Sequence, residues 1–385
     1  MATTAAAVTR VKHDLGVPTK VHSRDPEALK PVLAGLVARQ FPERQDLAVT
    51  RIEIPSGAGV NNETLLLDLA WREAGAPRRA GAVLRLESDD TLFPQPPFTD
   101  HYRLYQLMKA QARVPVPDVW GLRLKPSPLG KASFFMEMID GRVPADQPPF
   151  HTEGWVHDLT EQDRRAMWID AVDVMARVHA TPVEDVAFLD RPALGRSGVE
   201  QELSYTLDYM DWALDGDRHP VLEQTADWLR HNLPVDAGTS LAWGDARPQN
   251  LMYRDNRVVA LLDWDMASLA GPEADLAWWT LMDLSVTASR GLSRLPGWGS
   301  PAETMARWEQ ITGRRLRDMD WHFVLAAFRG GVIVMRLAKI LDAKGLLPAQ
   351  SADWKDNNIG IQYCASLLGL PPMSADSRAW PGPDA

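Results

Sequence analysis

Residues 241–265, LAWGDARPQNLMYRDNRVVALLDWD, form the stretch around which the rest of the chain is organised. Two short apolar runs, residues 250–253 and 258–262, are separated by the sequence RDNR, which is rich in turn-forming residues. Apolar runs joined by such a short polar segment are typical of a β-hairpin. The stretch therefore predicts two antiparallel strands whose outer ends lie side by side.

Acidic and amide side chains flank this predicted hairpin. Asp245 and Asn250 precede its first strand, and Asp263 and Asp265 follow its second strand. Because the ends of a hairpin are adjacent, Asn250 and Asp263 are expected to lie close together, where their oxygen atoms suit a hard cation. The spacing from Asp245 to Asn250 is also that of the protein-kinase catalytic loop, in which the Asp accepts a hydroxyl proton and the Asn holds magnesium.

Asp and Asn at this spacing also occur by chance, and such residues commonly build ordinary turns. In this chain the pair stands after an apolar approach, residues 241–243, and before a hairpin and a D-W-D sequence. This order within one short window favours a magnesium and phosphoryl-transfer site over an ordinary loop.

The sequences WGDARPQN (residues 243–250) and LLDWDMASLAGPEADLAWW (residues 261–279) resemble the signature of the aminoglycoside phosphotransferase-like kinases, which are relatives of choline kinase. The chain is most similar to the branch that includes the kinase-like domains fused to some acyl-CoA dehydrogenases. The resemblance covers residues 28–370 and implies an α+β, protein-kinase-like two-lobed fold with a β-rich N-lobe and a mainly helical C-lobe. In one departure, Trp243 stands where the family has a His.

The composition limits the classes of binding partner and the cellular compartment that are expected for this protein. The 385 residues carry a net charge of −10 and no long basic run, so neither nucleic acid nor an anionic membrane is expected as the main partner. Cys364 is the single cysteine, which excludes an internal disulfide and fits a reducing compartment. The first residues lack a signal-peptide pattern, and charged residues interrupt the most apolar late stretch, residues 323–341. A soluble, cytoplasmic protein is predicted.

A glycine-containing loop lies in the first part of the chain. Residues 1–27 are predicted to be a disordered tail and residues 28–142 a nucleotide-binding N-lobe. Predicted strands at residues 49–54 and 65–71 flank PSGAGVNNET, a pattern with which kinases cover nucleotide phosphates and which ordinary hairpins also show. The resemblance implies that this loop binds ATP, through Gly57, Gly59, Asn61, Asn62 and Thr64.

The next predicted strand, residues 81–86, occupies the position of the kinase V-A-I-K strand, with Arg85 in place of the Lys. Arg can still neutralise the α- and β-phosphates, although its planar fork differs from an ammonium group, and the alternative is an exposed Arg paired with a carboxylate. In the predicted helix 99–112, the resemblance places His101 where a Glu normally pairs with the Lys. Glu87, Asp100 and Glu137 remain open as substitutes.

The predicted strand 133–139 ends in the sequence MEMID. The resemblance implies an interlobe hinge at Glu137, Met138 and Ile139, where backbone groups bond adenine. The residues alone indicate an apolar strand that runs into a glycine-containing turn. The Pro-rich residues 143–150 mark the predicted lobe boundary.

Residues 143–370 are predicted to form the C-lobe, and residues 371–385 a disordered tail. Amphipathic periodicity predicts helices at residues 161–179, 200–214, 221–233, 274–284, 302–312, 321–341 and 354–368. Within them, His179 is predicted to be a buried structural residue and Asp275 a helix cap or an anchor for the catalytic loop. The glycine-rich residues 285–300 are predicted to form a mobile loop.

The resemblance and the spacing together assign roles to the central residues. Asp245 is expected to orient the acceptor hydroxyl and to accept its proton, and Arg247 to neutralise charge in the transition state. Asn250 and Asp263 are expected to hold Mg²⁺ against the phosphates of ATP. Asp265 either binds a second ion or is structural.

The predicted function is an ATP- and Mg²⁺-dependent kinase of a small-molecule hydroxyl group. The C-terminal helices carry few of the clustered carboxylates that a polycationic aminoglycoside needs, which favours an apolar or partly anionic acceptor such as a hydroxyacyl thioester. The residues expected to wall the acceptor pocket are Trp278, Trp279, Trp321, Phe323, Phe328, Arg329 and Arg336. The alternatives are an aminoglycoside kinase, a nucleotide-binding pseudokinase suggested by Trp243, Arg85 and His101, a nuclease or phosphatase, and a non-catalytic structural protein.

Overall fold

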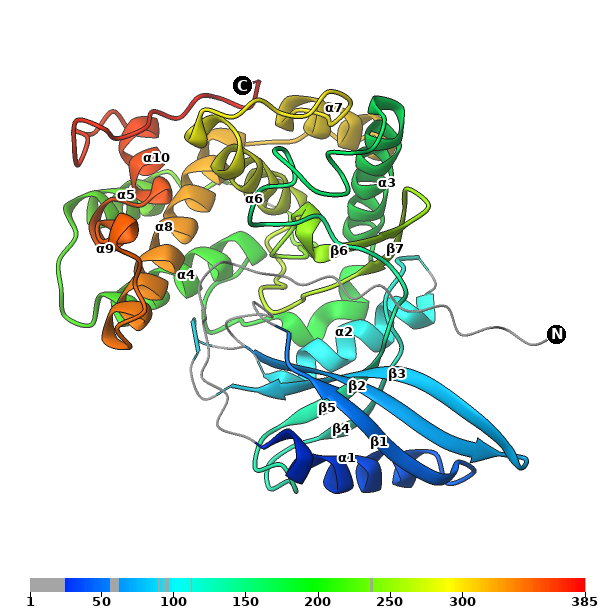
Figure 1. The fold of residues 1–385 in the computed structure, drawn as a ribbon. Helices are drawn as coiled ribbons and strands as arrows, with labels where there is room; N and C mark the ends of the chain where they lie inside the picture. Colours follow the sequence, from blue (N-terminus) through cyan, green and yellow to red (C-terminus); the bar gives the residue numbers. More distant parts are fainter. Residues whose placement is uncertain are drawn as a thin grey trace. The chain divides into compact units, whose positions relative to one another are not determined.

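The computed structural model of the protein describes residues 25–55, 62–88, 91, 92, 94, 97–111, 113–235 and 238–384. The chain forms two compact units. The first consists of Met1–Thr91, Pro97–Gln147 and Leu251–Leu262, and the second of Leu92–Pro96, Pro148–Asn250 and Asp263–Ala385. The first is built on a β-sheet, whereas the second is mainly helical (Figure 1).

The first unit contains a five-stranded antiparallel sheet with the strand order β1-β2-β3-β5-β4. The strands are β1 (Gln45–Glu53), β2 (Asn62–Glu73), β3 (Ala76–Glu87), β4 (Val119–Arg123) and β5 (Ser133–Glu137). β2 and β3 are longer than predicted because a two-residue turn at Ala74 and Gly75, both with positive φ, continues their pairing into polar sequence.

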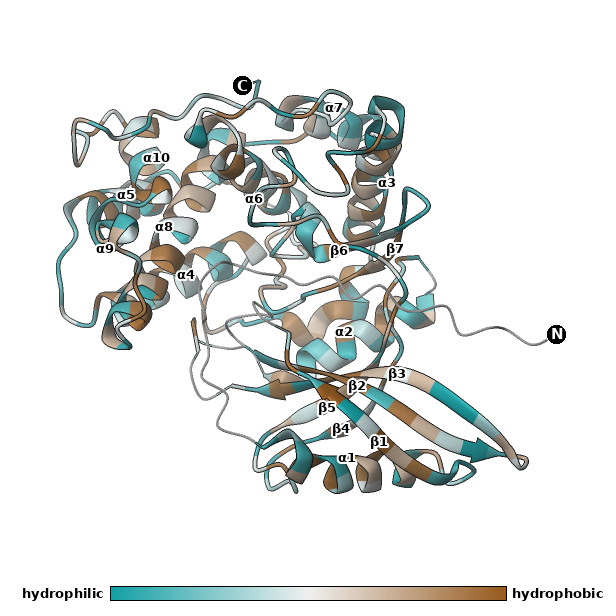
Figure 2. Ribbon diagram, in the orientation of Figure 1, coloured by the Kyte–Doolittle hydropathy of each residue, from teal (hydrophilic) through white to brown (hydrophobic). Residues whose placement is uncertain are grey.

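Helices α1 (Pro26–Gln40) and α2 (Phe98–Gln111) cover opposite faces of this sheet (Figure 1). Phe135 of β5 packs in the core cluster that includes Leu33 and Val37 of α1. The preceding residue, Phe134, has its ring 5.1 Å from that of Phe98 in α2. Successive strand residues point to opposite faces, so both faces of the sheet are apolar and covered. Figure 2 shows brown and teal segments alternating along the strands.

The predicted hairpin is confirmed. Strands β6 (Leu251–Arg254) and β7 (Arg257–Leu261) pair in an antiparallel register, with Leu251 opposite Leu261. Asp255 and Asn256 form the two-residue turn with φ values of 50° and 61°, as the right-handed twist of a hairpin requires. The paired end of the hairpin is therefore flanked by Asn250 on one side and by Asp263 on the other.

This hairpin belongs to the first unit, whereas the sequence placed it within a C-lobe of residues 143–370. Tyr253 and Arg142 exchange two backbone hydrogen bonds of 2.8 and 2.7 Å, and the Leu261 N–H donates to the Pro115 carbonyl over 2.7 Å. These bonds join segments more than a hundred residues apart in sequence, a pairing that local sequence patterns do not contain.

The second unit holds the remaining helices. They are α3 (Glu161–His179), α4 (Gly198–Leu214), α5 (Pro220–His231), α6 (Pro272–Val286), α7 (Pro301–Thr312), α8 (Met319–Ala343), α9 (Trp354–Asn357) and α10 (Ile359–Leu367). Helix α8 is central and packs against α4, α5, α6, α9 and α10. The single helix predicted at residues 354–368 is broken at Asn358, whose side chain accepts hydrogen bonds from the Gly360 and Ile361 N–H groups and caps α10.

The prediction of a disordered tail from residue 371 is wrong for residues 371–384. The Trp380 ring packs 5.0 Å from the Tyr363 ring and 5.3 Å from the Phe323 ring. The Ala302 N–H donates to the Pro383 carbonyl over 3.0 Å, and the Arg378 N–H donates to Gln362. One partly buried aromatic, Trp380, anchors this Pro-rich segment, and composition alone does not reveal such an anchor.

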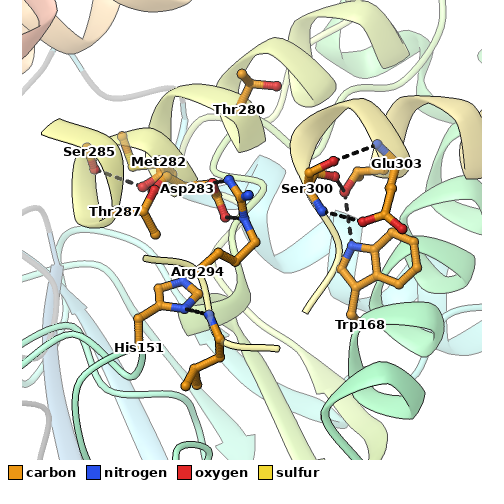
Figure 3. Close-up of polar contacts among 12 residues, drawn as sticks. His151, Trp168, Thr280, Met282, Asp283, Ser285, Thr287, Arg294, Ser300 and Glu303 are labelled. Carbon is orange, nitrogen blue, oxygen red and sulfur yellow. Dashed lines mark hydrogen bonds and ion pairs between the residues drawn. The ribbon is translucent and has the colours of Figure 1, made fainter. Parts of the chain in front are cut away.

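Residues 285–300 make specific contacts with the helices around them and do not form the predicted mobile loop (Figure 3). Arg294 forms a buried ion pair with Asp283 of α6, and the Leu295 N–H donates to His151 Nδ1 over 3.3 Å. Burial and the charge of Arg294 lower the pKa of His151 to about 3, so its ring is neutral and accepts this bond. Burial raises the pKa of the Asp283 carboxyl, and the Arg294 hydrogen bond opposes that shift.

No helix in the described part of the chain combines the length and the hydropathy that a membrane-crossing segment needs.

Candidate active site

The loop that carries Asp245 is fixed by the carboxylate of Asp275, in the first turn of α6. Asp275 is 1% exposed, and its two oxygens accept hydrogen bonds from the Trp243 N–H at 2.6 Å and the Gly244 N–H at 2.7 Å. A carboxylate at the start of a helix is also stabilised by the helix dipole. The predicted anchoring role of Asp275 is confirmed, because these bonds hold the backbone immediately before Asp245.

His179, at the end of α3, supports this anchor. Its Nδ1 accepts a hydrogen bond of 2.9 Å from the Trp308 indole, which can only donate. The proton of the neutral ring is therefore on Nε2, which lies 2.8 Å from Asp275 Oδ2 and donates to it. His179 is buried and structural, as predicted.

Gly244 is held from its carbonyl side as well. With a φ of 93°, it has a backbone conformation that favours glycine, and a Cβ there would collide with the Met266 carbonyl. The Gly244 carbonyl accepts a hydrogen bond from Arg329 of α8. Arg329 also donates to Glu202 of α4 over 2.7 Å, and both of these charged side chains are buried. Residues of α6 and α8 thus bond the peptide groups next to Asp245 directly, and Glu202 of α4 bonds Arg329.

Both carboxylate oxygens of Asp245 have partners. Oδ1 accepts from the Trp278 indole at 2.7 Å, and Oδ2 accepts from the Asn250 amide at 2.7 Å. Arg247 Nε lies 3.3 Å from Oδ2. The Arg329 guanidinium lies 4.2 Å above the Trp278 ring, on which it stacks. The structure therefore brings together Asp245, Arg247 and Asn250 and fixes the orientation of the carboxylate.

Trp243 links the loop that carries Asp245 to the segment after the hairpin. Its side chain is fully buried, and its indole donates a 2.8 Å hydrogen bond to the backbone carbonyl of Asp263. Asp263 has a φ of 59°, a left-handed conformation that Asp tolerates better than most residues, and its Oδ1 accepts from the Asp265 N–H at 3.1 Å. The indole of Trp243, at the position where the resemblance implies a His, thus has a positioning contact of its own.

The oxygen donors at the paired end of the hairpin fit Mg²⁺. The Asn250 amide nitrogen makes both of its hydrogen bonds to Asp245, at 3.0 Å to the carbonyl and 2.7 Å to Oδ2, which presents Oδ1 as the remaining oxygen donor. Asp263 follows β7 at the end of the hairpin where Leu251 pairs with Leu261, and its carboxylate is the second candidate ligand. Among the described residues, no three His, Cys, Asp or Glu side chains form a metal-binding cluster. Mg²⁺ commonly takes one or two protein ligands and completes its shell with phosphates and water.

The candidate nucleotide-binding residues belong to the first unit. Gly57, Gly59 and Asn61 lie outside the described residues. Thr64 of β2 pairs with Arg85 of β3, and Thr64 Oγ1 is 3.4 Å from an Arg85 guanidinium nitrogen. Asn62, at the start of β2, is fully buried. His101 of α2 is also buried, with its ring 5.9 Å from that of Phe98.

The predicted hinge residues lie at the end of β5. Glu137 pairs with Ala82 of β3, and its N–H donates to the Asp118 carbonyl over 2.8 Å. Met138 lies against Gly81, where a Cβ would collide with the Met138 sulfur. Ile139 follows and is partly buried.

Four of the aromatic residues predicted to wall an acceptor pocket are core residues instead. Trp279, Trp321, Phe323 and Phe328 are between 0% and 5% exposed. Trp321 donates its indole hydrogen to the Leu229 carbonyl within the helical core. Large aromatics dominate core packing in general, and this accounts for their abundance in the second unit.

Sequence reasoning missed the roles of Trp278, Arg329 and Glu202 around Asp245. For Trp278 a signal was present, because it stands three residues after Asp275 on the same helix and shares its face. If Asp275 holds the loop, Trp278 one turn later faces the same loop. No comparable local signal relates Glu202 to Arg329, which are 127 residues apart.

We expect Trp278→Phe to lower kcat about tenfold with little change in the KM for ATP, because one of the hydrogen bonds that orient Asp245 is lost. The matched control is Trp279→Phe, the same substitution one residue along α6, where the ring packs in the core. Steady-state kinetics with varied ATP measure both parameters. Equal kcat values for the two variants would remove Trp278 from the site.

Comparisons with known proteins identify the family of the chain. Residues 69–317 match the model of the phosphotransferase enzyme family. The chain is 25% identical over 329 residues to the probable acyl-CoA dehydrogenase IBR3 of Arabidopsis thaliana, and the match covers 80% of this chain and 38% of that protein. The chain thus spans less than half the length of that relative.

Two solved structures share the fold. A putative aminoglycoside phosphotransferase from Ralstonia eutropha JMP134 has a TM-score of 0.60 at 22% identity, covering 85% of this chain and 94% of that chain. A thermostable mutant of aminoglycoside phosphotransferase APH(4)-Ia, in complex with AMP-PNP and hygromycin B, has a TM-score of 0.53 at 14% identity, covering 88% and 98%. The predicted α+β, kinase-like two-lobed fold is confirmed. Because the family match spans more than half of the chain, this protein belongs to the phosphotransferase enzyme family.

Proposed function

We propose that this phosphotransferase moves the γ-phosphoryl group of ATP to a hydroxyl group of a small molecule, with Asp245 as the catalytic base. The observation that carries the proposal is the contact between Asp245, Arg247 and Asn250 on a loop held by Asp275. The transition state of phosphoryl transfer is loose, so the protein contributes mainly position and charge. A carboxylate held by several donors is suited to that task.

Each residue has a distinct part in the proposed reaction. Asp245 orients the acceptor hydroxyl and accepts its proton, while Trp278 and Asn250 keep its carboxylate from rotating. Arg247 stabilises negative charge on the transferred group. Asn250 and Asp263 would hold Mg²⁺, which neutralises phosphate charge when bound, and Asp265 is proposed to support Asp263.

ATP as the nucleotide is supported by the related fold of APH(4)-Ia, whose solved complex contains AMP-PNP. The nucleotide would contact Asn62, Thr64 and Arg85 on the first unit, together with Gly57, Gly59 and Asn61 of the loop and with Glu137, Met138 and Ile139 of the hinge. A nucleotide-binding pseudokinase is the second candidate, since Arg85 and His101 depart from the Lys–Glu pair. Trp243 favours it less, because its indole keeps a positioning contact with Asp263.

We expect Arg85→Ala to raise the KM for ATP about tenfold, because a guanidinium that bonds phosphate in a charge-assisted way is lost. Arg85→Lys should retain a measurable part of the activity, since the charge remains. Arg78, an exposed Arg on the same strand, supplies the control Arg78→Ala. Unchanged ATP kinetics in Arg85→Ala would show that Arg85 has a structural role only.

For the acceptor we propose a molecule that is apolar or anionic at one end, such as a hydroxyacyl thioester. The relative IBR3 is named a probable acyl-CoA dehydrogenase, and acyl-CoA is an acyl thioester. Two carboxylates of the second unit are also neutralised by arginines: Glu202 pairs with Arg329, and Asp283 with Arg294. A polycationic aminoglycoside would need such carboxylates free.

The test is Mg²⁺-dependent ADP release with a kanamycin-type aminoglycoside, choline and a hydroxyacyl-CoA, in the wild type and in Asp245→Asn. We expect turnover of the thioester that Asp245→Asn abolishes. Turnover of the aminoglycoside at micromolar KM, with none of the thioester, would overturn the acceptor assignment. Nucleotide binding without turnover of any acceptor would favour the pseudokinase.

A further inference from the structure

Arg336, on α8, is a half-buried cation whose charge has no counter-ion in the described part of the chain. Its Nε is buried and has no hydrogen-bond partner among the described residues. The guanidinium stacks over the ring of Trp212 of α4, with 4.2 Å between Cζ and the ring centroid. Trp212 is 40% exposed, which is unusual for a large aromatic. The pair thus presents a planar cation beside an accessible aromatic surface.

The neighbouring cations of α8 each have a counter-ion. Arg329, two turns earlier, pairs with Glu202 of α4, and Lys339, one turn later, pairs with Asp217 at 2.7 Å. Removing a charge from water without pairing it costs free energy. We therefore expect the unpaired cation among these three residues of α8 to bind a partner from outside the chain. A planar guanidinium matches carboxylate and phosphate groups, which it can bind with two parallel hydrogen bonds.

A series of neighbouring side chains on α4 and α8 connects the candidate active site with Arg336. Burial is the main cause that raises the pKa of the Tyr205 hydroxyl, and the charges of Arg329 and Asp265 also act on it. One turn further along α4, burial raises the pKa of the Tyr209 hydroxyl, and the positive charge of Arg336 opposes part of that shift. These electrostatic neighbours form a continuous series from Asp265 to Arg336. Arg336 follows Arg329 by seven residues, so the two lie on the same face of α8, about 10 Å apart.

We propose that Arg336, stacked on Trp212, is the specificity-determining residue that binds a carboxylate or phosphate group of the acceptor. This inference rests on the proposed function and deepens it. Arg329 contacts the loop of Asp245, so the anionic group would lie on the order of 10 Å from the hydroxyl that Asp245 activates. The acceptor is then elongated, with its negative charge at the end remote from the reacting hydroxyl. A polycationic acceptor would be repelled at the same position.

The experiment uses two pairs of acceptors that differ in charge. The carboxylate pair is ω-hydroxydecanoate and its methyl ester, and the phosphate pair is β-hydroxydecanoyl-CoA and the corresponding N-acetylcysteamine thioester. For each compound, kcat/KM is measured in the wild type, in Arg336→Met and in Arg336→Lys. Lys339→Met is the matched control, because it removes a charge from the same helix one turn away, where the cation is already paired.

We expect Arg336→Met to lower the ratio of kcat/KM between the anionic and the neutral member of at least one pair by about tenfold or more, mainly through KM. Arg336→Lys should restore part of that ratio, and Lys339→Met should leave it at the wild-type value. The pair that responds shows whether the group is a carboxylate or a phosphate. Wild-type ratios in Arg336→Met, or an equal change in Lys339→Met, would overturn the inference.

Failure of the proposed function gives a different result. If the wild type phosphorylates none of the four compounds, calorimetric titration with the same compounds still tests Arg336. Weaker binding of the anionic members by Arg336→Met than by the wild type would support the anion subsite. Equal binding of the charged and neutral members by the wild type would exclude it.

Discussion

Asp245→Asn should lower kcat for phosphoryl transfer by about a thousandfold, which is within the range expected for loss of a general base. The amide cannot accept the acceptor proton. It also presents an NH₂ group where the carboxylate now receives hydrogen bonds from Trp278 and Asn250, so at least one donor would face another donor. Coupled ADP-release kinetics measure the loss.

Nucleotide binding distinguishes this loss from a general collapse of the site. Asp245→Asn should bind Mg-ATP nearly as the wild type does, because the base lies outside the proposed nucleotide contacts. Asp263→Ala should instead weaken Mg-ATP binding, since it removes a carboxylate that we propose as a ligand of the metal. Asp227→Asn, on the exposed face of α5, is the control for an isosteric loss of charge. Wild-type activity and nucleotide affinity in both site variants would refute the assignment.

The features predicted well from the sequence are those that local chemistry determines. The hairpin was visible because Asp255 and Asn256 suit a turn with two positive φ values and stand between two apolar runs. Asp275 was recognisable as an anchor because a carboxylate in the first turn of a helix seeks N–H donors. The family match then supplied the two-lobed fold, which neither pattern implies by itself.

The features that were missed depend on contacts between distant segments. Arg329 and Glu202 meet from two helices, and each would be placed on an ordinary amphipathic face by periodicity alone. The sequence places Trp279 and Trp321 in the wall of an acceptor pocket, although both fill the core, because hydrophobicity does not distinguish the two uses. The Pro-rich C-terminal segment was assigned to disorder because one anchoring residue, Trp380, hardly changes its average composition.

Asp275→Ala should produce the largest loss of stability among single substitutions at the site. The carboxylate is 1% exposed and accepts from the Trp243 N–H, the Gly244 N–H and His179. Its removal leaves three buried donors without an acceptor, and breaking such a buried charged arrangement costs about 3–5 kcal/mol of unfolding free energy. Urea unfolding, followed by circular dichroism, measures this loss at a pH at which the wild type is fully folded.

His179→Ala separates the two parts of this arrangement. It removes one donor and leaves both backbone bonds to Asp275, so its cost should be smaller, about 1–3 kcal/mol. In Asp275→Ala the loop before Asp245 also loses its anchor, and a displacement of about 1 Å is enough to lower kcat on the order of a hundredfold. Arg329 bonds the Gly244 carbonyl from the opposite side. If Asp275→Ala unfolded at the same urea concentration as the wild type and kept its kcat, Arg329 would be the group that holds the loop.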